Sequence, residues 1–86
     1  MEKKIEKIRE LLNNNLCVKI YGNECEVIDI EEDDNGNPIG ISVYYQEDLG
    51  GYGNYEEVQE TITWEDLFSN NHQFYTEKTT RELVEI

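Results

Sequence analysis

The stretch that decides the fold is VIDIEEDDNGNPIGISVYY, residues 27–45. In its second half Ile39, Ile41, Val43 and Tyr45 alternate with small or aromatic residues. Such alternation is typical of a strand with one buried face. The DDNGN segment between the two apolar halves has the composition of a tight turn. The sequence therefore predicts an antiparallel hairpin here and a sheet as the main element of the fold.

The strand before this turn has an irregular apolar pattern. From residue 24 to 31 the apolar positions change parity between Val27 and Ile28. Because side chains alternate between the two faces of a strand, one regular strand cannot bury all of them. A β-bulge or a strong bend near Ile28 would reconcile the pattern.

A further alternating segment, residues 16–20, precedes this strand. We expect a tight turn at Gly22 and Asn23 to join the two strands. This turn would place Cys17 and Cys25 on opposite faces of the sheet. Because neither cysteine belongs to a metal-ligand spacing, we expect two reduced packing residues rather than a disulfide or a zinc site.

Helical signals flank the sheet region. Apolar residues at helical spacing predict an amphipathic helix over residues 2–13, which three asparagines end. Thr63 stands three residues before Asp66, nearly a capping box, and predicts a short helix over residues 64–69. The tail TTRELVEI predicts a closing strand at about residues 79–86.

Together these elements predict a single α+β domain over residues 1–86. It would contain an N-terminal helix, a strongly bent antiparallel sheet of four or five strands, and a short helix before the last strand. Residues 16–63 would form the sheet apart from that last strand. The segments VKIYGNECEVIDI, PIGISVYY and EEVQETITWEDLF resemble the Src-homology-3-like small barrels over residues 17–86. That resemblance implies a small-barrel-like sheet and says little about activity.

The charge is unevenly distributed along the chain. The net charge is -13, and residues 20–77 contain fifteen acidic residues and no Lys or Arg. This segment would repel phosphate groups, which excludes direct binding of nucleic acid or of an anionic membrane through a basic surface. Solubility is an alternative reason for such acidity.

The residues give little support to catalysis. His72, the only histidine, lies in the polar stretch SNNHQ, and GGYGN lacks the lysine of a phosphate-binding loop. Glu31, Asp33, Asn35 and Gly36 match the first half of a calcium loop, but Ser42 stands at its twelfth position, where a bidentate glutamate is needed. We therefore expect no enzyme, no metal site and no cofactor. Because the sequence shows no signal peptide or membrane span, we expect a soluble, cytoplasmic protein.

Acidic and aromatic residues along turns and strand edges are the candidates for binding a partner. Carboxylates form charge-assisted hydrogen bonds with Arg and Lys, and tyrosine rings accept cations. We expect the loop EDLGGYGNY, residues 47–55, to be flexible and to expose its tyrosines, and Tyr45 to be partly core. The candidate partner-binding residues are Glu24, Glu26, Glu31, Glu32, Asp33, Asp34, Glu47, Asp48, Tyr52, Tyr55, Glu56, Glu57 and Glu60.

A small chain with these acids and tyrosines resembles the small acidic anti-CRISPR and other phage-encoded DNA-mimic proteins. The resemblance rests on size, charge and layout, because those proteins share no common motif. It implies an inhibitor that occupies the basic nucleic-acid-binding groove of a host protein such as a Cas effector, in the bacterial cytoplasm. We expect a monomer or a weak homodimer. The alternative is an ordinary protein–protein interaction module that uses the aromatic loop, with acidity for solubility.

Overall fold

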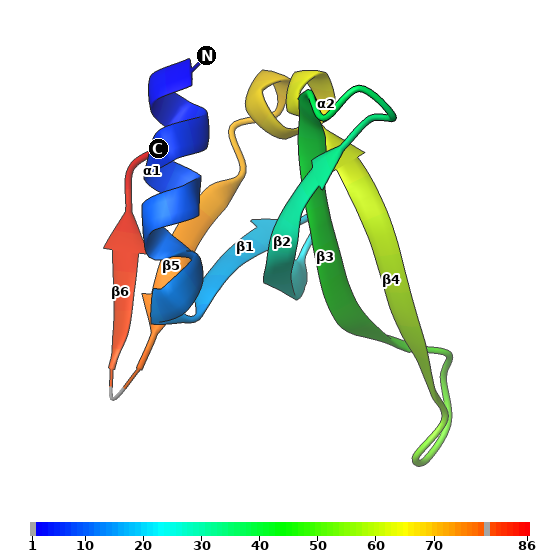
Figure 1. Cartoon of the computed structure of the whole chain (residues 1–86). Coiled ribbons are helices and arrows are strands. Elements are labelled where there is room, and N and C mark those ends of the chain that lie inside the picture. The colour runs from blue at the N-terminus through cyan, green and yellow to red at the C-terminus, as the bar shows by residue number, and fades with distance from the viewer. Residues whose placement is uncertain (1, 79) are drawn as a thin grey trace.

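One antiparallel sheet dominates the computed structural model, which describes residues 2–78 and 80–86. Within these residues the sheet has six strands, in the order β4-β3-β2-β1-β5-β6. Two helices and a 3-10 turn complete the described part of the chain (Figure 1). The elements are α1 Glu2–Leu11, the 3-10 turn Leu12–Asn14, β1 Leu16–Ile20, β2 Asn23–Glu32, β3 Pro38–Asp48, β4 Tyr55–Thr63, α2 Trp64–Ser69, β5 Gln73–Glu77 and β6 Arg81–Val84.

This architecture shows that the expected fold class was wrong. The sheet is open and, within the described residues, has six strands, so it is not a small barrel of four or five. The difference comes from β5, a strand that the sequence did not indicate. It follows α2 and pairs with both β1 and β6, so α2 precedes two strands instead of one. The expected closing strand is β6, and its proposed start at Thr79 lies outside the described residues.

The N-terminal helix ends close to where the asparagines predicted. Asn15 adopts the left-handed conformation with φ of 55°, which ends the 3-10 turn that follows α1. Its side-chain amide donates to the Glu77 carbonyl oxygen at 3.0 Å, and the Glu77 amide donates to the Asn15 carbonyl oxygen at 3.2 Å. The end of the helical segment is thus fastened to β5.

The turn between β1 and β2 lies one residue earlier than expected. Ile20 pairs with Asn23, so the central residues are Tyr21 and Gly22, with φ of 48° and 84°. Positive φ at both positions is characteristic of the type I′ hairpin turn. In the resulting register Val18 lies opposite Cys25 and Cys17 lies opposite Glu26. The two thiols therefore occupy opposite faces as predicted, and both are free.

The predicted irregularity in β2 is confirmed. The register between β2 and β3 shifts between Val27 and Asp29, which leaves Ile28 as the extra residue of a bulge. Ile28 is 46% exposed, whereas Val27 and Ile30 are buried. Because of the bulge, Val27 and Ile30 both point into the core although their spacing in the sequence is odd.

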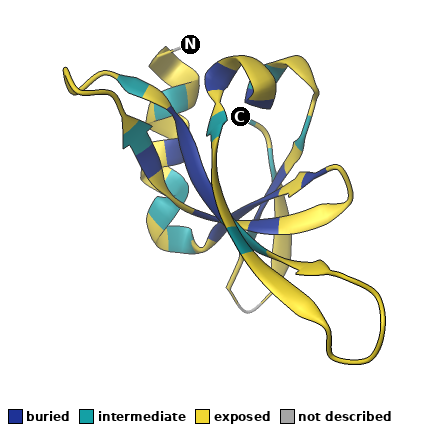
Figure 2. Cartoon of the chain, turned by 90° about the vertical axis from the view of Figure 1, so that its right-hand side faces the viewer, coloured by how far each residue is buried: buried dark blue, intermediate teal, exposed yellow. Residues whose placement is uncertain are grey.

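The core lies on the face of the sheet that carries the helices (Figure 2). Strands β1, β2, β3 and β5 contribute buried side chains, β4 contributes only partly buried ones, and both helices cover the cluster. Ile5, Leu11, Leu12, Tyr45, Ile62, Phe68, Val84 and Ile86 pack around this cluster. The buried cluster consists of Ile8, Leu16, Val18, Ile20, Cys25, Val27, Ile30, Ile41, Val43, Trp64, Leu67 and Phe74.

β3 and β4 approach each other closely at Gly40. A Cβ atom on Gly40 would overlap the Ile62 carbonyl oxygen and lie 2.9 Å from the Thr63 Cα. Immediately beyond this pair, α2 begins at Trp64, whose indole Nε1 donates to the Pro38 carbonyl oxygen at 2.9 Å. The predicted cap is also present, because the Thr63 hydroxyl accepts from the Asp66 amide. Glycine at position 40 therefore allows β4 and α2 to close onto β3.

We predict that Gly40→Ala lowers the free energy of unfolding by about 3 kcal/mol, because the added methyl group meets backbone atoms that cannot move independently. Gly50→Ala is the matched control. Gly50 has φ of 84° but open space around its Cβ position, so that variant carries only a backbone penalty of about 1 kcal/mol. Urea unfolding of both variants measures the difference. Equal losses would show that the close approach at Gly40 is unimportant.

Candidate interaction surface

The ends of β3 and β4 and the loop between them project from the rest of the sheet (Figure 1). We call residues 46–57 the arm. All twelve of its residues are exposed, as Figure 2 shows. The Leu49 amide donates to the Asn54 carbonyl oxygen at 2.9 Å, and the Asp48 carboxylate accepts from the Gly50 amide at 2.9 Å. The loop therefore has its own hydrogen bonds although it contributes nothing to the core.

The arm carries four carboxylates and no Lys or Arg. Glu47 of β3 lies directly opposite Glu56 of β4 in the strand register. Like charges in that position destabilise a strand pair. Within residues 2–78 and 80–86, the ion pairs that form do not involve the arm. Its negative charge is thus available to an external cation.

Exposed aromatic residues accompany these carboxylates. Tyr52 in the loop is fully exposed, Tyr55 is 60% exposed, and Leu49 is 53% exposed. Tyrosine is a common anchor in protein interfaces, and its ring attracts the same cations that carboxylates bind. The prediction that this loop presents its tyrosines on the surface is confirmed.

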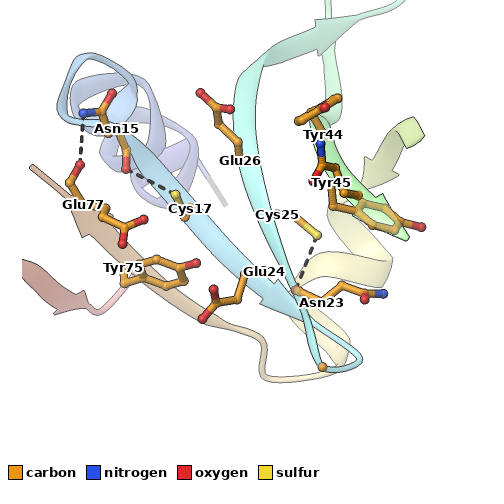
Figure 3. Close-up of a pocket in the computed structure, with 12 residues that line it drawn as sticks. Asn15, Cys17, Asn23, Glu24, Cys25, Glu26, Tyr44, Tyr45, Tyr75 and Glu77 are labelled. Carbon is orange, nitrogen blue, oxygen red and sulfur yellow. Dashed lines mark hydrogen bonds between the residues drawn. The ribbon is translucent and has the colours of Figure 1, made fainter. Parts of the chain in front are cut away.

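A second group of expected residues lies on the face of the sheet turned away from the core, which we call the open face. One row of paired residues crosses all six strands there: Gln59, Tyr44, Glu26, Cys17, Tyr75 and Leu83. Four residues of this row, Tyr44, Glu26, Cys17 and Tyr75, line a hollow in the sheet with a volume of about 730 Å³. Figure 3 shows Tyr75 and Glu77 of β5 on one side of the hollow, Tyr44 of β3 on the other, and Glu24 and Glu26 between them.

Arg81 of β6 already occupies part of this acidic surface. Its Nη1 lies 2.8 Å from Glu24 Oε1 and its Nη2 lies 3.6 Å from Glu77 Oε1. The guanidinium also lies over the Tyr75 ring, 4.5 Å from the centroid. Glu24 is therefore neutralised within the chain, whereas Glu26 is not ion-paired to any described residue. Sequence reasoning missed Arg81 because its position depends on the pairing of β5 with β6.

The acids of the β2–β3 turn form a third group, at the opposite end of β3 from the arm. The Asp33 carboxylate accepts from the Asn35 and Asn37 amides, both at 2.9 Å. These hydrogen bonds, that of Asn37 first, hold the pKa of Asp33 below its ordinary value. Within the described residues, no group of three or more His, Cys, Asp or Glu side chains could hold a metal ion. Asp33 caps a turn, beside Glu31, Glu32 and Asp34.

The expected binding residues therefore do not form one continuous array. They divide between the arm, the open face and the β2–β3 turn. Glu60 stands apart from these three groups, because it lies opposite buried Val43 on the core side of β4. Burial is the largest cause of the raised pKa values of Tyr45 and Cys25, and the negative charge of Glu60 is the next largest.

The remaining titratable groups do not favour nucleophilic chemistry. Burial, followed by the charges of Glu77 and Glu26, raises the pKa of Cys17. A raised pKa reduces the thiolate that a nucleophile requires. His72 packs edge-on against Tyr21, with 5.3 Å between the ring centroids. The chemistry that the surface offers is the binding of cationic groups by exposed carboxylates and tyrosines.

Comparison with protein-family models, with curated proteins and with solved structures found no match to this chain. Among the described residues, neither helix has the length and apolar character that crossing a membrane requires. The interaction that this surface supports therefore has to be inferred from its geometry and its charge.

We predict that the free energy of unfolding falls as the pH rises above about 9. Burial raises the pKa of Cys25 from 9.0 to about 11 and that of Tyr75 from 10.0 to about 12. Between the ordinary and the raised pKa of each group, the unfolded chain has lost a proton that the folded chain retains. A rise in pH through this range therefore favours unfolding. The contribution of Cys25 is present below pH 9 and is lost by about pH 11.

Urea unfolding at pH 8 and at pH 10.5 measures this loss. Cys25→Val cannot ionise and has a similar volume, so it should retain more of its stability at the higher pH than the unmodified chain does. Cys17→Val is the comparison at the second cysteine, on the other face of the sheet. If Cys25→Val loses as much stability as the unmodified chain, Cys25 does not cause the alkaline loss.

Proposed function

We propose that this protein is a non-catalytic inhibitor that inserts the arm into a basic nucleic-acid-binding groove of a partner protein. In that groove the carboxylates of the arm take the positions of nucleic-acid phosphates. The observation that carries the proposal is the arm itself, whose twelve exposed residues include four carboxylates and two tyrosines and no Lys or Arg.

The shape of the arm supports this proposal. A two-stranded β-ribbon is narrow enough to enter the major groove of DNA, so it also fits a protein groove of similar width. Alternate residues along one strand are about 6.8 Å apart, whereas DNA carries one charge per about 3.4 Å of each strand. The arm is less densely charged than DNA but has the same sign and an elongated shape. Binding would therefore block the groove both sterically and electrostatically.

The pairing of Glu47 with Glu56 supports a cationic partner. In the free chain the two like charges repel each other across the strands. An arginine or lysine of the partner placed between them would replace repulsion with two attractive contacts. Part of the binding free energy would thus come from removing an unfavourable interaction, which favours a basic partner over a neutral one.

A Cas effector is the first partner class to test, since the chain resembles the phage-encoded anti-CRISPR proteins in size, charge and layout. The second candidate function is an interaction module that binds through Leu49, Tyr52 and Tyr55. The exposure of these three side chains favours it. The two functions differ in their dependence on salt, because apolar contacts are not screened.

We predict that the protein competes with DNA for a Cas effector and that its affinity falls steeply between about 50 and 500 mM salt, since the Debye length falls from about 14 to 4 Å. Competition in a mobility-shift assay measures both effects. Glu47→Lys with Asp48→Lys should weaken competition about tenfold or more. Glu31→Lys with Glu32→Lys is the matched control, because it changes the net charge equally at the opposite end of β3.

Three outcomes would contradict the proposal: no competition across a panel of Cas effectors and other groove-containing nucleic-acid-binding proteins, a salt-insensitive complex, or equal effects of the two double variants. A salt-insensitive complex that Tyr52→Ser with Tyr55→Ser abolishes would instead support the interaction module. Amide spectra of each variant show whether the fold is retained.

A further inference from the structure

Among residues 2–78 and 80–86, β4 forms one edge of the sheet and pairs only with β3. The pairing is regular over nine residues, from Thr63 opposite Gly40 to Tyr55 opposite Asp48. Seven of these nine residues are exposed, and Val58 and Ile62 are partly buried. The sheet of the described residues has no strand beyond β4, so the outer backbone N–H and C=O groups of this strand have no ladder partner.

This edge lacks most of the devices that prevent strand addition. β4 contains no proline and no lysine, and its register shows no bulge. Five of its residues are Tyr, Val, Thr or Ile, which favour extended structure. The opposite edge, β6, is only four residues long. β4 is therefore the better template for an added strand.

Charge determines which strand this edge can accept. Glu56, Glu57 and Glu60 are the charged residues of β4. If two copies of the chain paired through β4, six glutamates would lie along one short interface, and like charges across strands are destabilising. A second copy is thus disfavoured, whereas a strand that carries Lys or Arg is attracted.

The positions of these glutamates define a pattern. Glu60 pairs with Val43 and Val58 pairs with Tyr45, so Glu56, Val58 and Glu60 share the core-side face of β4. Successive members are about 6.8 Å apart. An added strand complements this face when it presents a cationic, an apolar and a second cationic side chain at alternate positions.

We propose that the free edge of β4 binds an extended segment of the partner by strand addition, and that this segment carries Lys or Arg at two positions that flank an apolar residue at alternate spacing. The inference rests on the proposed function in one respect, namely that the partner is basic. It assigns a different kind of contact, since the groove contacts the carboxylates of the arm and the added strand pairs with the backbone edge of β4, which shares residues 55–57 with the arm. Backbone hydrogen bonds would give affinity and the side-chain pattern would give specificity.

The test uses the full chain and a synthetic peptide, Thr-Lys-Thr-Val-Thr-Lys-Thr with blocked ends. Amide spectra recorded during titration should show the largest changes within residues 55–63. A peptide of identical composition, Thr-Lys-Val-Thr-Lys-Thr-Thr, places its lysines on opposite faces and should bind about tenfold more weakly. Glu56→Gln with Glu60→Gln should weaken binding of the first peptide by a similar factor, whereas Glu31→Gln with Glu32→Gln should leave it unchanged.

N-methylation of the peptide separates strand addition from simple charge attraction. Methyl groups on the amides of one edge of the peptide strand should abolish binding, and methyl groups on the other edge should leave it intact. Strand addition is overturned if neither set weakens binding, if both unmethylated peptides bind equally, or if none binds at millimolar concentration. Concentration-dependent changes at residues 55–63 without peptide would also overturn it, because they would identify a second copy as the occupant.

These outcomes are independent of the groove proposal. Peptide binding to β4 without competition for nucleic acid would retain strand addition and remove the groove. Competition that depends on Glu47 and Asp48, together with failure of every peptide, would retain the groove and remove strand addition. The two sets of variants share no residue, since Glu47 and Asp48 lie on β3 and Glu56 and Glu60 on β4, although Glu56 is also part of the arm.

Discussion

The pairing of β1 with strands on both of its sides holds the two halves of the sheet together. β1 has only five residues, yet it pairs with β2 on one side and with β5 on the other. At its centre, fully buried Val18 lies between Cys25 and Phe74. The long strands β2, β3 and β4 thus connect to the β5–β6 hairpin through this short strand. The core on its helix-covered face depends on that connection, because α1 and α2 pack against the same buried cluster.

The arm contributes negative charge without adding to this core. A chain with a net charge of -13 repels itself when it folds into a small volume. Placing residues 46–57 away from the core reduces that repulsion, but the pairing of Glu47 with Glu56 restores part of it locally. Burial therefore does not explain the arm, whereas the cationic partner that we propose would.

The sequence predicts the locally determined parts of this fold. The hairpin between β2 and β3, the bulge at Ile28 and the Thr63 cap follow from short-range patterns, and the structure contains each of them. β5 was missed because its two apolar residues, Phe74 and Tyr75, are adjacent and both buried, one on each face. A strand that is buried on both faces shows no alternation. The open six-strand order thus depends on pairing between distant residues, which local patterns do not encode.

The same distinction applies to the candidate surface. Exposure of the arm follows from its glycines and carboxylates, so it could be anticipated. The contact of Arg81 with Glu24 could not, because it requires the β5–β6 hairpin to fold back beside β2. The expected acidic surface was consequently divided into three groups, of which one is partly neutralised within the chain.

The only tryptophan offers a natural optical reporter of one end of the molecule. Trp64 is buried, its ring is stacked on Phe68 with 5.8 Å between centroids, and its indole is hydrogen-bonded to Pro38. Its fluorescence therefore reports the junction of α2 with the start of β3. The arm lies at the other end of β3 and carries only tyrosines as aromatic residues. A change at the arm that leaves the emission of Trp64 unaltered can thus be distinguished from loss of the core.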